Sequence, residues 1–464
     1  MDIVQFVDKI DAAPTVRLDL NNESPWATKT EGTDLSPPPL RQAWAGTLLT
    51  DGEQLTAAAY DNRQLRLKLE LIASSVDNVA ASLQALWREL NRPANILRWQ
   101  PTGASFPVHF KTFRSADNAV VDYPGPGLLR TVDVRIAAEP FAYGLRQTLS
   151  QVTVSSNPAA GSNGCYFDVT GVKGDVETPL HLSLDDGFTV LRQPMFAVRR
   201  RGTPSAMPFV LQAESMTLGT DAALGASNDA ALSGSGQNYV RISYATNASM
   251  QNRVSSTSWP STPSVDVRGT YRVLARIRRN TGTDTHYLRL SYGNSSSPIY
   301  GDIVSTPSAS ITDPIWVDLG LVPYPTGQDP VTDMSAAEIP VGGQYLAVQT
   351  QRVSGAGTLD LDCLLFVPAD DRLLIATLNP DAGAVAQVID SARTMAYGVG
   401  ASGEIRPTIP AQIAGGAPMV SPGVTNRIAM INILQGTPGD TITTTRKVTP
   451  SYWPRYLHIA AAGS

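Results

Sequence analysis

The sequence predicts a mostly β protein of several domains, with one helix in its N-terminal part. Charged residues make up only 17% of the chain, while 37 glycines and 34 prolines favour turns. Runs of alternating apolar and polar residues recur from end to end, which is the period of half-buried strands. At 464 residues the chain is also too long for one hydrophobic core, so we expect two to four domains.

The strongest pattern is a strand followed by a helix in the N-terminal part. Leucine occupies every second position of residues 65–71, which predicts a strand with one buried face. Residues 75–91 carry apolar side chains at helical spacing, so we expect one amphipathic helix there. Ser74 or Ser75 suits its N-terminal cap, and Pro93 ends it. The apolar stripe comprises Val76, Val79, Ala80, Leu83, Leu86, Trp87 and Leu90.

Residues 21–46 are polar and rich in proline, which predicts a long irregular loop or arm. Loops of this length often contact a partner. Trp26 and Trp44 lie in it. Each is either an interface anchor or packed against its own domain, and the second interpretation is favoured.

Composition shifts along the chain divide it into three expected domains. The first comprises residues 1–147. A second β-domain is split between residues 148–207 and 371–464, and residues 208–370 form a separate unit. That unit has many strands at short intervals, turn signals and no helical pattern, so we expect a β-sandwich inserted into the second domain or joined between its parts.

The net charge and the lack of long apolar runs argue against several classes of protein. A net charge of −5 gives no reason to expect nucleic acid or an anionic membrane as partner. Residues 1–20 lack the apolar core of a signal peptide, and no run is long enough for a membrane span, so we expect synthesis in a cytoplasm. Cys165 and Cys363 are far apart in sequence; two buried thiols are favoured over a disulfide.

No motif points to catalysis. The sequence has no phosphate-binding loop, nucleophile elbow or metalloprotease motif. Because these motifs are missing, we predict that the protein is not an enzyme. Asp360 and Asp362 share one face of an expected strand, which makes a cation site conceivable. Its four histidines fall in expected strands, where packing is favoured over a functional role: His109, His181, His286 and His458.

Three stretches resemble a bacteriophage family. The helix ends Leu-Trp-Arg-Glu-Leu-Asn-Arg-Pro, residues 139–144 read Glu-Pro-Phe-Ala-Tyr-Gly, and residues 422–428 read Pro-Gly-Val-Thr-Asn-Arg-Ile. With the order of elements, they resemble distal tail proteins, also called minor tail proteins, of long-tailed non-contractile bacteriophages (siphophages). The resemblance covers about residues 1–200 and 371–464 and includes no catalytic residue.

The resemblance implies a fold, a function and partners. It implies an N-terminal β-sandwich or split-barrel domain with one helix, and a galectin-like second β-domain. Such proteins form a ring, usually a hexamer, that joins the tail tube to the baseplate or tip of the virion. The implied partners are the chain itself, the tail tube protein and tail hub or tip proteins, with assembly in the host cytoplasm. The alternative is a host-surface carbohydrate-binding adsorption protein without a ring role; a polysaccharide hydrolase is not expected.

Residues 208–370 are similar to jelly-roll carbohydrate-binding modules. In such modules an acid on the first strand and one on the last hold a structural calcium, and Glu214 and Asp362 match these positions. Gln212 stands where a second acid is common, so the resemblance leaves open a calcium or no cofactor. Binding of a host cell-surface polysaccharide would need aromatic faces on loops or on a flat sheet. The glycan candidates are Trp259, Tyr292, Tyr300 and Tyr324.

Overall fold

The computed structural model confirms a mostly β chain with a single α-helix among its described residues. It describes these parts of the chain: residues 2–22, 24–46, 53–115, 119–122, 128–155, 166–185, 193–200, 209–225, 232, 238–244, 249–259, 269–280, 284–306, 314–324, 344–369, 373–378, 384–393, 395–406, 413–415, 418–432 and 445–457.

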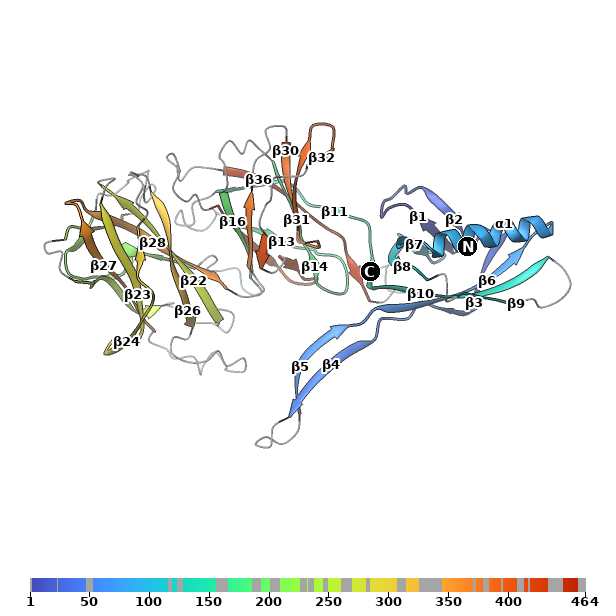
Figure 1. The fold of residues 1–464 in the computed structure, drawn as a ribbon, viewed down its shortest axis with the longest axis horizontal. Helices are drawn as coiled ribbons and strands as arrows, with labels where there is room; N and C mark the ends of the chain where they lie inside the picture. The colour runs from blue at the N-terminus through green and yellow to red at the C-terminus, as the bar shows by residue number, and fades with distance from the viewer. Residues whose placement is uncertain are drawn as a thin grey trace. The chain divides into compact units, whose positions relative to one another are not determined.

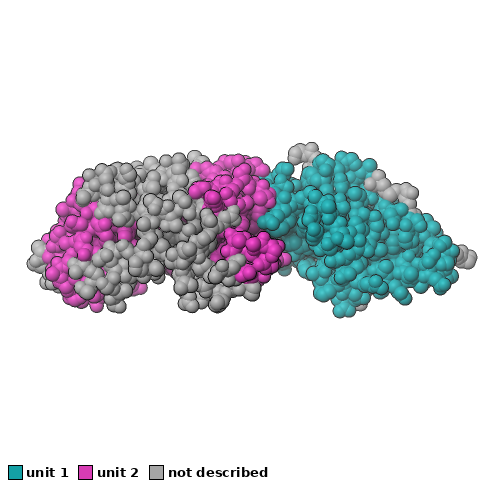
Figure 2. Space-filling model, turned by 90° about the horizontal axis from the view of Figure 1, so that it is seen from above, with its two compact units in different colours: residues 1–147, 172–178, 452–464 teal, residues 148–171, 179–451 magenta. Residues whose placement is uncertain are grey.

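The chain separates into two compact units, coloured in Figure 2. The first comprises Met1–Gln147, Val172–Thr178 and Tyr452–Ser464, and the second Thr148–Gly171 and Pro179–Ser451. The expected division into three domains stays a prediction.

One nine-stranded antiparallel sheet forms the body of the first unit (Figure 1). Its main path is β2 (Val16–Asp19), β1 (Ile3–Val7), β7 (Ala94–Gln100), β8 (Val108–Phe113), β10 (Leu129–Tyr143), β6 (Arg63–Ile72) and β3 (Trp26–Asp34). Two further strands pair with β10: β9 (Ala119–Asp122) and β37 (Arg455–Tyr456).

The alternating leucines of β6 all point into the core, as predicted. Leu65, Leu67, Leu69 and Leu71 are at most 1% exposed. The helix α1 (Val76–Leu90) contributes Leu86 and other apolar side chains to the same core. The sheet and helix therefore bury one continuous apolar layer, as expected for an amphipathic helix packed on a sheet.

The helix ends lie where the sequence places them. Ser75 is the N-cap, and its side chain accepts a hydrogen bond from the amide of Asn78 at 3.2 Å. Asn91 is the C-cap. Two members of the predicted stripe differ, because Val76 at the first helical position is 69% exposed and Ala80 is exposed as well.

Residues 21–46 were expected to be irregular, and this prediction is wrong. They contain β3 and the strand β4 (Leu40–Gly46), and β4 pairs with β5 (Glu53–Tyr60) in a separate two-stranded ribbon (Figure 1). Trp26, the first residue of β3, is buried in the core of its own domain, which is the interpretation that the sequence favoured. Trp44 is 52% exposed. Proline at the ends of strands does not prevent pairing of the residues between.

Two sheets combine strands from before and after residues 208–370. The seven-stranded sheet contains β11 (Gln147–Thr148), β36 (Thr445–Tyr452), β15 (His181–Asp185), β30 (Ala384–Asp390), β31 (Met395–Gly400) and β32 (Ile405–Arg406), with β12 (Val152–Ser155) on β36. The five-stranded sheet contains β13 (Tyr166–Val169), β35 (Asn426–Asn432), β16 (Gln193–Arg200), β29 (Leu373–Leu378) and β33 (Ile413–Gly415). A short pair links β14 (Thr178–Pro179) with β34 (Met419–Val420).

Two six-stranded sheets enclose the largest apolar core, within residues 209–368. One contains β19 (Ala222–Leu224), β20 (Val240–Ile242), β28 (Leu359–Pro368), β22 (Gly269–Arg279) and β26 (Ile315–Tyr324), with β17 (Phe209–Gln212) on β28. A 3-10 turn, η2 (Ala213–Ser215), follows β17. The other contains β18 (Thr217–Leu218), β21 (Gln251–Trp259), β27 (Gln344–Ser354), β23 (Thr285–Asn294) and β24 (Ser297–Tyr300), with β25 (Val304–Ser305) on β23.

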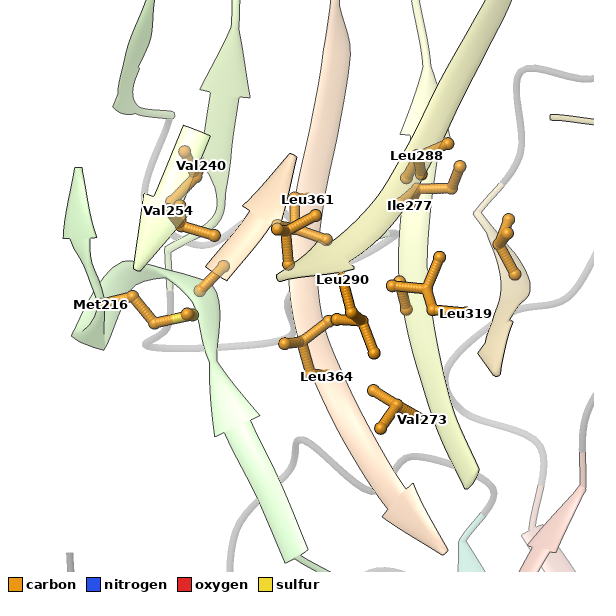
Figure 3. Packing of buried hydrophobic residues seen from close by; sticks show 14 of the residues in the cluster. Met216, Val240, Val254, Val273, Ile277, Leu288, Leu290, Leu319, Leu361 and Leu364 are labelled. Carbon is orange, nitrogen blue, oxygen red and sulfur yellow. The ribbon is translucent and has the colours of Figure 1, made fainter. Parts of the chain in front are cut away.

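Side chains from both sheets meet in this core. Figure 3 shows Val273, Ile277 and Leu364 of the first sheet near Leu288 and Leu290 of the second. The arrangement is that of a β-sandwich, in which alternate residues of each strand point inward.

Candidate interaction surfaces

The β4–β5 ribbon exposes an apolar stripe. The pairing places Leu40 opposite Tyr60, and after a register shift Trp44 lies opposite Leu55. Leu40 and Trp44 are four residues apart on β4 and so lie on one face, and their partners Tyr60 and Leu55 lie on the same face because the register shift offsets the odd spacing along β5. Leu40, Trp44 and Leu55 are each about half exposed. A two-stranded ribbon with both faces in water has little to stabilise it.

The base of the ribbon is anchored to its own unit by an aromatic contact. The ring of Tyr60 meets the ring of Phe141 edge to face, with centroids 5.6 Å apart. Phe141 belongs to the Glu-Pro-Phe-Ala-Tyr-Gly motif and also lies under the Arg455 guanidinium, 5.0 Å from its carbon. The motif therefore joins the ribbon to the C-terminal strand β37.

Other residues of this motif form a polar cluster. The Tyr143 hydroxyl donates to Glu139 at 2.5 Å, and Lys111 Nζ lies 3.4 Å from the same carboxylate. Burial raises the pKa of Tyr143. The amide of Gly144 donates to the carbonyl of Pro454 at 2.9 Å. These contacts hold the end of β10 against the segment that leads into β37, so the role of this cluster is structural.

The outward face of the sheet with β23 and β27 carries a connected row of polar side chains. Arg289 Nε donates to Gln349 Oε1 at 2.7 Å, and Gln349 Nε2 donates to Asn252 Oδ1 at 2.8 Å. Asn252 Nδ2 in turn donates to the Tyr345 hydroxyl at 2.8 Å. At the other end of the row, the Arg289 guanidinium lies over the ring of Tyr300, 4.2 Å from its centroid. The row spans four adjacent strands and fixes each side chain by its neighbour.

The predicted aromatic candidates do not form one site. Tyr300 is 51% exposed, but Tyr292 packs against the core. Trp259 and Tyr324 end β21 and β26, and their side chains lie outside the described residues. Of the four, only Tyr300 has a described side chain open to a ligand.

Sequence reasoning missed the polar row beside Tyr300. The alternation in β23 already places Arg289 on the face opposite the core residues Leu288 and Leu290. What alternation does not give is the register. Pairing of Arg289 with Gln349, and of Gln349 with Asn252, aligns the row.

The two calcium candidates lie near each other but beside an arginine. The charges of both Glu214 and Asp362 act on the thiol of Cys363, whose pKa is raised well above its usual value, chiefly by burial. Burial also raises the pKa of Glu214. Arg276, itself buried, places Nε 3.9 Å from Oδ2 of Asp362. Calcium takes six to eight oxygen ligands, and the described residues contain no group of three or more acidic, histidine or cysteine side chains that could hold a metal ion. Against this, Oε2 of Glu214 is buried without a hydrogen-bond partner among the described residues. The calcium site therefore stays a prediction.

Asp360 does not join Asp362 in a cation site. A register shift in β28 lies between them, because Cys363 pairs with Arg276 but Leu361 pairs with Ile277. The fully buried Asp360 carboxylate instead accepts hydrogen bonds from Arg241 and Arg278, at 2.8 and 2.9 Å. A buried carboxylate between two guanidiniums is satisfied by them.

The histidines and cysteines mostly occupy packed positions. His109 and His286 are fully buried, and His181 lies 3.2 Å from Asp390. Cys363 is buried and free. His458 and Cys165 lie outside the described residues. Within the part of the chain that the structure describes, no helix has the length and apolar character needed to cross a membrane.

Comparisons with known proteins give structural likenesses at low scores. No family model and no curated protein matches the sequence. Among solved structures, the chain is similar to the Dit (gp 19.1) protein of phage SPP1, with a TM-score of 0.29, 10% identity, and coverage of 78% of this chain and 98% of that one. It is also similar to a chain of the phage P2 baseplate in its activated conformation with Ca, with a TM-score of 0.27, 9% identity and the same coverages. Likenesses at these TM-scores do not carry an argument about function.

Proposed function

We propose that this chain is a structural protein of a siphophage tail tip that forms a ring between the tail tube and the baseplate. The sequence resemblance of residues 1–200 and 371–464 to distal tail proteins supports the proposal. The observation that carries it is the exposed β4–β5 ribbon, whose apolar stripe a contact with another molecule would bury. Its partners in this proposal are further copies of the chain, the tail tube protein and the tail hub or tip proteins.

The apolar stripe of the ribbon favours assembly. Leu40, Trp44 and Leu55 leave much apolar surface in water on a two-stranded element that cannot bury it internally. Packing this stripe on a neighbouring copy would remove that surface from water. A contact between the ribbon and a different surface of the neighbouring copy is head to tail, and such contacts close into rings when the rotation permits.

The alternative function is host-surface carbohydrate binding by residues 208–370 without a ring. Tyr300 and the polar row beside it favour a binding role for this module. The two functions are compatible, since a tail-tip ring can carry a module that contacts the cell.

The test is the double substitution Trp44→Ala and Leu55→Ala in the full chain. Both side chains are exposed in the single chain, so we expect its melting temperature to stay unchanged while ring assembly is lost. Mass photometry across a concentration series and negative-stain electron microscopy measure assembly. The matched control is Leu224→Ala, since Leu224 is 53% exposed in the other unit and should leave rings intact.

Two outcomes would contradict the ring. The first is a wild-type chain that stays monomeric at every concentration and is absent from virions. The second is a double variant that assembles as well as the wild type. The first outcome would leave carbohydrate binding as the favoured function.

A further inference from the structure

We propose that the outward face around Arg289 and Tyr300 binds an anionic polysaccharide, with a sugar ring on Tyr300 and a carboxylate or phosphate on Arg289. The inference rests on the proposed glycan-binding role of residues 208–370. It adds the face, the residues and the chemical class of the ligand. The sequence named Tyr300 only as one aromatic among four.

Arg289, Ser291 and Tyr300 lie on one face of the sheet. Ser291 pairs with Tyr300 on β24, and Arg289 lies two residues before Ser291 on β23, so all three point the same way. The neighbouring core residues Leu288 and Leu290 point inward. Tyr300 therefore stands on the outer surface of the sandwich, next to a guanidinium.

The polar side chains of this face are held in place before any ligand binds. Arg289 is held by Gln349 and by the Tyr300 ring, while Gln349 is held by Asn252. Gln349 is only 7% exposed, so the row is anchored from below, whereas Asn252 is exposed. Side chains fixed before binding lose less conformational entropy when a ligand arrives.

Arg289 is the charged group of this face. Arg289 uses Nε in its hydrogen bond to Gln349, and no carboxylate of the described residues forms an ion pair with it. Arg241, Arg272, Arg276 and Arg278 on the opposite sheet each lie beside an aspartate, so Arg289 differs from them. A guanidinium with its remaining donors available matches a carboxylate or phosphate. An aromatic face beside it suits the apolar face of a sugar ring.

The ligand class follows from these features together. A neutral glycan would use Tyr300 and Asn252 but leave the guanidinium without an anion. Nucleic acid is disfavoured because the chain carries a net charge of −5. A polymer of sugars that bear carboxylates or phosphates satisfies both the ring and the cation.

The experiment is affinity electrophoresis of the full chain in native gels. One gel contains polygalacturonate as the carboxylate polysaccharide, a second contains a phosphomannan as the phosphate polysaccharide, and a third contains neutral dextran. We expect retardation by at least one anionic polymer, weakened by added salt, and none by dextran. The polymer that retards the chain tells whether the ligand carries carboxylate or phosphate.

Variants locate the site. We expect Arg289→Gln to weaken binding about tenfold or more, and Tyr300→Ala to weaken it similarly. The matched control is Arg272→Gln, which removes a half-exposed arginine from the opposite sheet and should leave binding unchanged. Tyr300 is half exposed, so Tyr300→Ala should fold even if Arg289→Gln does not.

Three results would overturn the inference. They are no retardation of the wild type by either anionic polymer, equal retardation by dextran, and equal loss of binding in Arg289→Gln and Arg272→Gln. Mass photometry of the same samples separates this from the ring proposal. Rings without polymer binding refute only the polysaccharide site, and binding without rings refutes only the assembly.

Discussion

At the scale of single residues, the buried histidines His109 and His286 make the stability of the fold depend on pH. Burial is the main cause that lowers the pKa of His109 to about 4, opposed by its contact with the Tyr143 carbonyl. Burial also lowers the pKa of His286 to about 4; Asp284 opposes this, and Arg279 and Arg352 add to it. Both imidazoles are therefore neutral in the folded protein at neutral pH.

The sign of the resulting pH dependence follows from linkage. An unfolded histidine has a pKa of about 6.5, so between pH 6.5 and 4 the unfolded chain binds more protons than the folded one. The free energy of unfolding should fall as the pH falls through this window, by at most about 3 kcal/mol per histidine. Below pH 4 these two groups contribute no further change.

The measurement is the melting temperature from pH 7.5 to 5.5, a range in which ordinary carboxylates stay ionised. Histidine ring signals in nuclear magnetic resonance spectra provide the control, since two rings should resist protonation down to about pH 4. A pH-independent melting temperature with all rings titrating near 6.5 would contradict the burial argument.

Also at the residue scale, the Arg276 guanidinium competes with a cation for Asp362, because its Nε lies 3.9 Å from Oδ2 of that carboxylate. We expect the melting temperature to be the same in millimolar calcium and in chelator. A rise of several degrees that Asp362→Asn abolishes would mean that the chain supplies further oxygen ligands.

At the scale of elements, the helix α1 was predictable because its signals are local. The N-cap Ser75, the apolar stripe and the terminating Pro93 all lie within about 20 residues, and the observed bounds Val76–Leu90 agree with them. The ribbon β4–β5 was not predictable in the same way. Its strand residues carry no core-facing alternation, because the ribbon has no core beneath it.

The helix also allows a matched comparison of two substitutions. Leu86 is 1% exposed, so Leu86→Ala should lower the free energy of unfolding by about 2–5 kcal/mol. Val76 is 69% exposed on the same helix, and Val76→Ala should change it by no more than about 0.5 kcal/mol. Urea unfolding followed by circular dichroism measures both. Equal effects would show that the helix does not bury Leu86 against the sheet.

At the scale of the whole molecule, the strands pair across very long stretches of sequence. The strand β16 pairs with β29 and β35, and β37 near the C-terminus pairs with β10. The sheets with β16 and β15 therefore cannot be complete until residues beyond 371 have been made. Long-range pairing of this kind is slow to form, since the chain must close large loops first.

The sequence by itself determined the fold class, the helix and the inward face of strands such as β6, because these depend on local periodicity. Only the tertiary structure decided which strands pair, in which register they pair, and which side chains are in contact. It turned residues 40–46 into half of an exposed ribbon, and it placed Arg276 beside Asp362. It also packed Tyr292 inward and aligned Arg289 with Gln349 and Asn252. Pairing joins residues tens of positions apart, so no local pattern contains that information.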